Sequence, residues 1–152
     1  MSNFIKRAYD RLEKFPLGKQ VFSRFVGFAA PYSGTVRPNI EELRPGYARV
    51  SMQDRKGLRN HLKSLHAVSM MNLGELATGL AINYSLPENS RGILKHLEMD
   101  YLKKGRGTLT AECTCDVPGN NHKAEYKVKA EIKNAEKEIV ARAEALWLVG
   151  PA

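Results

Sequence analysis

A single carboxylate stands out in the sequence because it interrupts a long apolar segment. Glu75 is the only acidic residue between Asp54 and Glu88, and it lies in the middle of residues 66–84. Burying an unpaired carboxylate is costly, and apolar surroundings raise its pKa. Such a carboxyl group can act as a general base near neutral pH. The alternative is that Glu75 lies on a solvated flank of the helix or caps a neighbouring backbone group.

His66 and Ala67 lie where the same segment begins. The first backbone N–H groups of a helix are unpaired and favour a negative oxygen. In thioester hydrolysis the carbonyl oxygen becomes negative in the transition state, so an N–H here, helped by an imidazole, could polarise the thioester. The alternative for His66 is a purely structural histidine.

The spacing of His66 and Glu75 has a geometric consequence. The two residues are nine positions apart. On a helix they would face opposite sides and lie ~13 Å apart along the axis. We therefore expect that one chain cannot bring both to one substrate, and that two chains share the site. Two antiparallel central helices across a two-fold axis would do this, with Gly74 and Gly79 easing the contact.

The surrounding pattern indicates which elements hold these residues. Residues 66–84 are apolar nearly all round, which predicts a helix buried on most sides. Residues 108–117 and 125–133 alternate apolar and polar side chains, as a sheet with one wet face requires. Strands are also expected at 93–102 and 139–148, completing a four-strand meander, and in a hairpin at 33–42 and 47–54. An amphipathic helix is expected at 4–15, and a second, short helix at about 18–28.

The order of these elements favours an α+β hotdog fold, in which an antiparallel sheet wraps a long central helix. We expect one hotdog domain over residues 1–152, with a helical N-terminal extension at 1–30 and the hotdog core at 33–149. The size and the 43% hydrophobic content suit one core.

Charge and cysteine content narrow the partners and the compartment. The net charge is +8, and residues 1–76 hold 13 Lys/Arg against 6 Asp/Glu. This basic half of the chain suggests an anionic partner. The alternative is a charged surface that keeps the protein in solution. No nucleic-acid-binding motif is present, so no nucleic acid is expected. The helix at 4–15 could lie on an anionic membrane, but packing across the sheet or over the pocket mouth is favoured.

Cysteine spacing and hydropathy complete this picture. Cys113 and Cys115 are two residues apart on one strand, where a disulfide is disfavoured, and they lack zinc-ligand spacing. No apolar run approaches a membrane span, and no signal peptide is evident. We expect a cytoplasmic protein with reduced thiols and no metal.

With these motifs in place, the sequence resembles the hotdog acyl-CoA thioesterase superfamily. It resembles the phenylacetyl-CoA thioesterase type, and more closely an uncharacterised hotdog domain family. The family pattern is an Asn, a His-Gly-Gly six residues later, and an acid nine residues after the His. Here Asn60, His66 and Glu75 keep that spacing. Residues 99–109 also resemble the family strand that leads into a basic turn, and the resemblance covers about residues 33–149.

The resemblance implies a role for each residue. Glu75 would be general base or nucleophile, the Ala67 amide would polarise the carbonyl, and Asn60 and His66 would orient substrate or water. Possible coenzyme A phosphate contacts are Lys103, Lys104 and Arg106, for which a solvated turn is the alternative.

The sequence also departs from the family pattern. Ala67-Val68 replaces the two glycines, and Ile82 replaces a hydroxyl residue for which Thr78 could substitute. The favoured function is a homodimer, or dimer of dimers, that hydrolyses an acyl-CoA or acyl-carrier thioester. Coenzyme A would enter only as part of the substrate, with no further cofactor. The alternative is a hotdog protein that binds or senses acyl-CoA or fatty acid without turnover.

Overall fold

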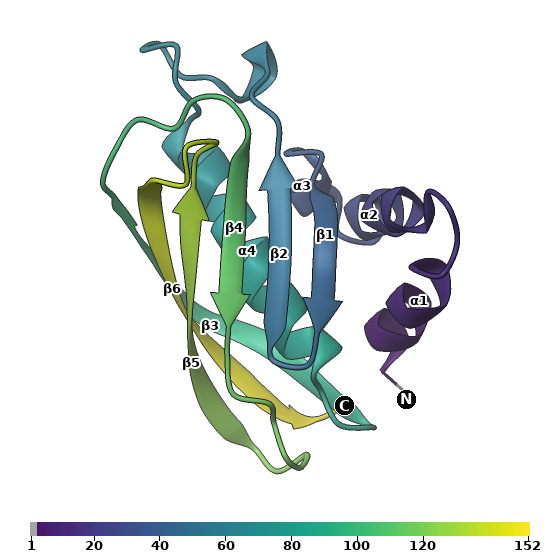
Figure 1. Cartoon of the computed structure of the whole chain (residues 1–152). Coiled ribbons are helices and arrows are strands. Elements are labelled where there is room, and N and C mark those ends of the chain that lie inside the picture. The colour runs from purple at the N-terminus through teal and green to yellow at the C-terminus, as the bar shows by residue number, and fades with distance from the viewer. Residues whose placement is uncertain (1–2) are drawn as a thin grey trace.

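A computed structural model describes residues 3–152 and shows an antiparallel sheet curled around one long helix (Figure 1). The helix is α4 (Ala67–Tyr84). The strands are β1 (Asn39–Arg44), β2 (Tyr47–Met52), β3 (Ser90–Tyr101), β4 (Leu109–Thr114), β5 (Ala124–Lys133) and β6 (Ile139–Pro151). The predicted α+β architecture, with a helix wrapped by a sheet, is confirmed.

The strand order is β1-β2-β4-β5-β6-β3, so the predicted four-strand meander is wrong. β4, β5 and β6 follow one another, but β3 pairs with β6 and β4 pairs with β2. Alternating polarity reports which face of a strand is buried and not which strand lies beside it. β3 follows α4 and forms the edge of the sheet opposite β1. The chain then crosses to β4, which pairs with β2.

α4 lies in the concave face of the sheet, and its glycines permit a close approach. A Cβ on Gly74 would lie 2.8 Å from the Ala143 Cβ, and one on Gly79 would lie 3.0 Å from the Trp147 ring. Both glycines therefore serve contacts with β6 of the same chain. The expectation that Gly74 and Gly79 ease contact with a second central helix is corrected accordingly: they ease the contact between α4 and β6.

Three helices precede the sheet: α1 (Phe4–Leu12), α2 (Gly18–Ala29) and the short α3 (Pro31–Gly34). α1 ends three residues earlier than predicted. The predicted strand at 33–42 is partly wrong, since α3 and a loop occupy its first half. Pro31, in the first turn of α3, suits a helix start there.

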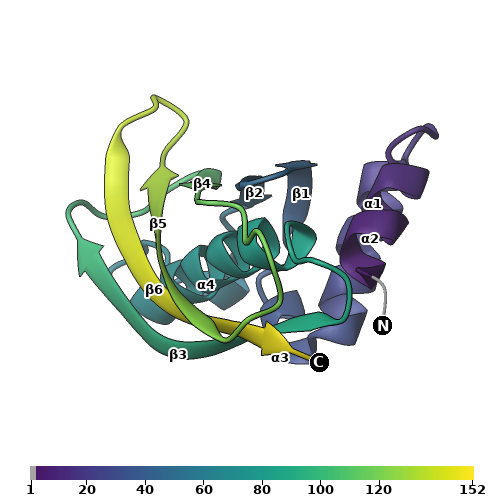
Figure 2. The same cartoon turned by 90° about the horizontal axis from the view of Figure 1, so that it is seen from below.

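The N-terminal helices cover the edge of the sheet at β1 (Figure 2). The Ile40 amide donates to the Ser23 hydroxyl at 2.8 Å, and the Leu43 amide donates to the Tyr9 hydroxyl at 3.1 Å. These bonds satisfy edge groups that would otherwise be open to another strand. β3, at the opposite edge, has no such cover within residues 3–152.

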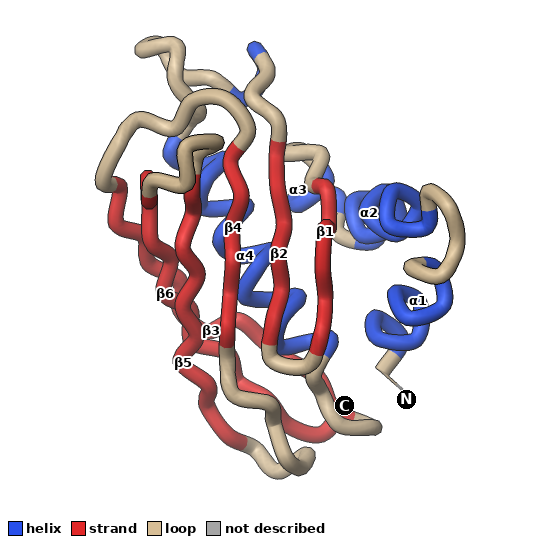
Figure 3. The backbone as a smooth tube through the Cα atoms, in the orientation of Figure 1, coloured by secondary structure: helices blue, strands red, loops and turns tan. Residues whose placement is uncertain are grey.

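The connections 53–66 and 102–108 lie together at the end of the molecule where α4 begins (Figure 3). The Leu65 amide donates to the Gly105 carbonyl, and the Gly107 amide donates to the Asp54 carboxylate. The helix start is therefore held by both loops. No helix within residues 3–152 is long and apolar enough to cross a membrane.

Candidate functional site

Glu75 borders a small apolar cavity between α4 and the N-terminal helices. The cavity measures about 200 Å³. Its other walls come from α1, α2, α3, α4 and β6: Ile5, Phe25, Val26, Ala29, Ala30, Ser33, Leu76, Gly79, Leu80, Asn83 and Trp147. The sequence alone does not identify these walls; the favoured expectation for the helix at 4–15 is that it packs across the sheet or over the pocket mouth.

The Glu75 carboxylate has no hydrogen-bond or ion-pair partner among residues 3–152. Burial raises its pKa above the ordinary value. A carboxyl group in that state carries a proton at higher pH than a solvated one. When ionised, the Glu75 carboxylate accepts no hydrogen bond from the described residues that would lower its basicity.

The start of α4 presents a backbone amide beside basic loops. Ala67 is the first helical residue, a position whose N–H has no partner inside the helix. It borders a cavity of about 320 Å³ that Asn60, Lys103 and Lys104 also line. The Tyr101 hydroxyl donates to the Ala67 carbonyl at 2.9 Å and ties β3 to this end of α4.

Two groups at this cavity are already engaged. The Asn60 side-chain oxygen accepts hydrogen bonds from the Leu62 and Ser64 amides, which shapes the loop. Lys103 pairs with Glu138 at 2.8 Å, whereas Lys104 has no ion pair within residues 3–152. Of the two lysines that line this cavity, Lys104 is thus the one without an ion pair in the described residues.

The structure does not bring His66 to the same cavity. Its Nδ1 accepts a hydrogen bond from the Val68 amide at 3.1 Å, so the imidazole caps its own helix. The residue borders a different cavity, of about 390 Å³, with Arg55 and Asn72. The His66 side chain thus occupies the Val68 amide, one of the N–H groups at the start of α4.

Two further predicted residues lie elsewhere. Thr78 is fully buried, and its hydroxyl donates to the Glu75 carbonyl and accepts from the Trp147 indole at 3.3 Å. It lines none of the cavities described above. Arg106 is exposed on the loop between β3 and β4 and borders neither the Glu75 cavity nor the Ala67 cavity.

Within one chain the predicted residues therefore divide into separate groups. Asn60, Ala67, Lys103 and Lys104 share one cavity, and Glu75 borders another. This agrees with the helical geometry, which places positions 66 and 75 on opposite sides of α4.

An antiparallel sheet wrapped around a single long helix is the arrangement of the hotdog fold, and this chain has that fold. Within that class, the chain belongs to the family described as Domain of unknown function (DUF4442), whose model matches residues 18–149. The resemblance to hotdog proteins seen in the sequence is confirmed. No curated protein matches the chain.

Solved structures share the fold over most of the chain. The structural-genomics protein APC5556 is 28% identical, with a TM-score of 0.83 over 98% of this chain and 99% of that one. PA5026 from Pseudomonas aeruginosa, described as a probable thioesterase, is 23% identical, with a TM-score of 0.76 over 91% and 97%. A thioesterase family protein from Silicibacter pomeroyi is 16% identical, with a TM-score of 0.73 over 86% and 96%.

Proposed function

We propose that the protein hydrolyses an acyl-CoA or acyl-carrier thioester. One observation carries the proposal: the Glu75 carboxylate lies in an apolar cavity without a partner among the described residues, and its pKa is raised there. The acyl group would enter this cavity, and Glu75 would take a proton from the attacking water. Hotdog structures described as thioesterases support the same chemistry.

The other polar groups have distinct roles in this proposal. The Ala67 amide would donate to the carbonyl oxygen as it becomes negative, and Asn60 would orient substrate. Lys104, with Lys103 and Arg106, would bind phosphates of coenzyme A. Thr78 would act indirectly, because its hydroxyl bond to the Glu75 carbonyl holds that turn of α4. His66 would fix the helix start as its cap.

The proposal requires a second chain, and the open edge at β3 offers a place for it. The Tyr101 hydroxyl bonds to Ala67 at one end of α4, and Gly92 lies against Asn83 at the other, so α4 runs antiparallel to β3. Pairing of two β3 strands about a two-fold axis would set two α4 helices side by side in opposite directions. That arrangement would bring the Glu75 of one chain toward the Ala67 of its partner.

Two apolar strips would become buried in such a dimer. Val68 is 49% exposed and Tyr101 is 43% exposed, and Met71, Leu97 and Met99 are half-buried. These residues lie on α4 and β3 and form an apolar surface that the described chain leaves partly in water. Burial in a homodimer would account for it.

The size of the Glu75 cavity limits the acyl group. At about 200 Å³ it is smaller than the ~300 Å³ at which ligand pockets usually begin. We therefore expect short or aromatic acyl groups to be preferred over long chains.

The test is hydrolysis of a panel of acyl-CoAs, measured by release of free thiol. The wild type should release thiol above background for at least one short or aromatic acyl group. Glu75→Gln should lose at least about 100-fold in rate, which is the usual contribution of a general base. Glu136→Gln, an exposed glutamate in the β5–β6 turn, is the matched control and should keep full activity. An unaffected Glu75→Gln variant contradicts the proposal.

A second function is favoured by the helix start itself. His66 occupies the Val68 amide, and Ala67 and Val68 carry side chains where glycines would admit a ligand closely. The protein would then bind an acyl-CoA without cleaving it. Acyl-CoA would raise the thermal unfolding midpoint by mass action while releasing no thiol.

A further inference from the structure

An apolar stripe runs along the outer face of α2. Leu17, Val21 and Phe28 are 70%, 50% and 84% exposed. Val21 and Phe28 are seven residues apart, so at ~100° per residue they lie within about 20° of one another on α2, and Leu17 directly precedes the helix. Arg24 borders the same stripe. Contiguous exposed apolar side chains of this kind mark an interaction surface, whereas isolated ones do not.

The segment that carries the stripe is strongly basic. Residues 3–38 hold seven Lys/Arg and two Asp/Glu, a net charge of +5 out of +8 for the whole protein. Phe15 and Tyr32, just before and just after the stripe, are 61% and 67% exposed. Apolar and cationic side chains are therefore concentrated in the same quarter of the chain.

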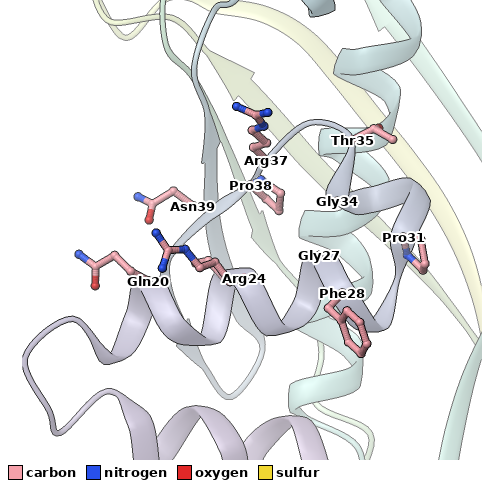
Figure 4. Close-up of a pocket in the computed structure, with 11 residues that line it drawn as sticks. Gln20, Arg24, Gly27, Phe28, Pro31, Gly34, Thr35, Arg37, Pro38 and Asn39 are labelled. Atoms are coloured by element: carbon pink, nitrogen blue, oxygen red, sulfur yellow. The ribbon is translucent and has the colours of Figure 1, made fainter.

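Beside the stripe lies the largest of the cavities described, with a volume of about 850 Å³. It separates α2 from the loop that enters β1 (Figure 4). Arg24 projects from the helix and Arg37 from the loop, with Gln20 and Asn39 at the same end. Neither arginine forms an ion pair within residues 3–152. Phe28, from the stripe, lines the other end of this cavity.

We propose that this face docks onto an anionic phospholipid surface. Val21, Phe28 and the neighbouring Leu17 would enter the acyl region, and Arg24 and Arg37 would bind headgroup phosphates. A second copy of the chain docked through the same face would set Arg24 and Arg37 against the same two arginines and be repelled. A nucleic acid would engage the arginines but leave the apolar stripe in water. An anionic lipid surface complements both features.

The inner face of α2 relates this surface to the cavity at Glu75. Val26 lines that cavity from the far side of the helix, and Phe25 and Ala29 line it from the flank. A docked protein would hold the cavity about one helix diameter, ~10 Å, from the lipid. The docking does not depend on thioester hydrolysis, so the two proposals fail or succeed separately.

Co-sedimentation of the full chain with lipid vesicles tests the docking. Vesicles of phosphatidylcholine mixed with phosphatidylglycerol should sediment the wild type at low salt, and vesicles of phosphatidylcholine alone should not. The double variant Arg24→Gln/Arg37→Gln should weaken partitioning about 25-fold, at about 5-fold for each charge. The double variant Val21→Ser/Phe28→Ser should weaken it about 10-fold or more.

Matched substitutions elsewhere on the surface control for general effects of net charge and of exposed apolar area on vesicle binding. Val117→Ser is equally exposed in the loop after β4, and Lys123→Gln is an exposed cation before β5; both should partition like the wild type. Thermal unfolding checks that each variant is folded. The proposal is overturned if the wild type fails to sediment, or if the controls weaken binding as much as the α2 variants. It is also overturned if the serine variant has no effect or changes only the oligomeric state.

Discussion

Glu75 is placed where its charge is a disadvantage to folding. Its carboxylate lies in apolar surroundings and has no partner in residues 3–152, and burial raises its pKa. Natural proteins keep such groups chiefly where they perform chemistry. The proposed role as a general base would account for this placement, whereas a contribution to stability would not.

The stability of the Glu75→Gln variant should depend on pH relative to the wild type. Because the folded pKa is above the ordinary 4.5, the folded state holds the proton more tightly than the unfolded state. Wild-type stability should therefore fall as pH rises from 4.5 through the folded pKa. Glutamine has no charge to bury, so the variant should become the more stable protein over that range and stay so above it. Urea unfolding across pH measures this, and a variant less stable at pH 8 than the wild type contradicts it.

α4 shows how tightly a single element is fitted to the sheet. Replacing Gly74 with alanine should improve intrinsic helix formation by up to ~1 kcal/mol. The new Cβ would lie 2.8 Å from the Ala143 Cβ, which is fixed to the backbone of β6. Overpacking of this kind costs ~1–3 kcal/mol, so Gly74→Ala should lower the free energy of unfolding by about 1–2 kcal/mol.

Gly119→Ala, in the loop between β4 and β5 where a Cβ would meet nothing within 4 Å, is the matched control and should not lower the free energy of unfolding. Denaturant unfolding distinguishes the two variants. A Gly74→Ala protein more stable than the wild type would show that the helix and β6 are less closely packed than described here.

Asn3 fastens α1 to the end of α4. Its side-chain amide lies within 3.0 Å of the carbonyl oxygens of Asn83, Tyr84 and Leu86, and its oxygen accepts from the Lys6 amide. Asn3→Ala removes a helix cap at one end and a carbonyl partner at the other. We expect a loss of about 1–2 kcal/mol in thermal or urea unfolding. Asn121→Ala, in the loop before β5, should cost less than about 0.5 kcal/mol, and equal effects would refute the fastening role.

The elements were predictable from sequence where the signal is local. The apolar run of residues 66–84 and the alternation in β4 and β5 require only the polarity of neighbouring residues. The position of β3 beside β6 was missed, because alternation carries no information about strand neighbours. The short helix α3 was missed because four residues are too few to show a helical period.

The candidate site was only partly predictable for a related reason. Glu75 and Ala67 could be found from composition and position along one helix. The contributions of Phe25 and Trp147 to the cavity depend on segments far apart in the chain meeting in space. The capping role of His66 depends on a side-chain rotamer, which spacing does not specify.

As a whole, the molecule has one closed edge and one open edge. The N-terminal helices cover β1 and wall the Glu75 cavity, while β3 stays open within the described chain. The helix start and the glutamate belong to different cavities of one chain. The account therefore depends on a dimer in which each site takes Ala67 from one chain and Glu75 from the other.

Two inactive variants can test this sharing. Glu75→Gln removes the base, and Ala67→Pro removes the amide hydrogen. Proline suits the first position of a helix, and His66 already has the extended conformation, with ψ at 141°, that precedes a proline. Each variant alone should lose at least about 100-fold in thioesterase rate while remaining folded.

The decisive measurement is the activity of the two variants expressed together as a mixed dimer. In a mixed dimer with shared sites, one site carries both defects and the other carries none. Random pairing should therefore restore about a quarter of the wild-type rate. A mixture no more active than either variant alone, or a protein that is monomeric while hydrolysing thioesters, would contradict the shared site.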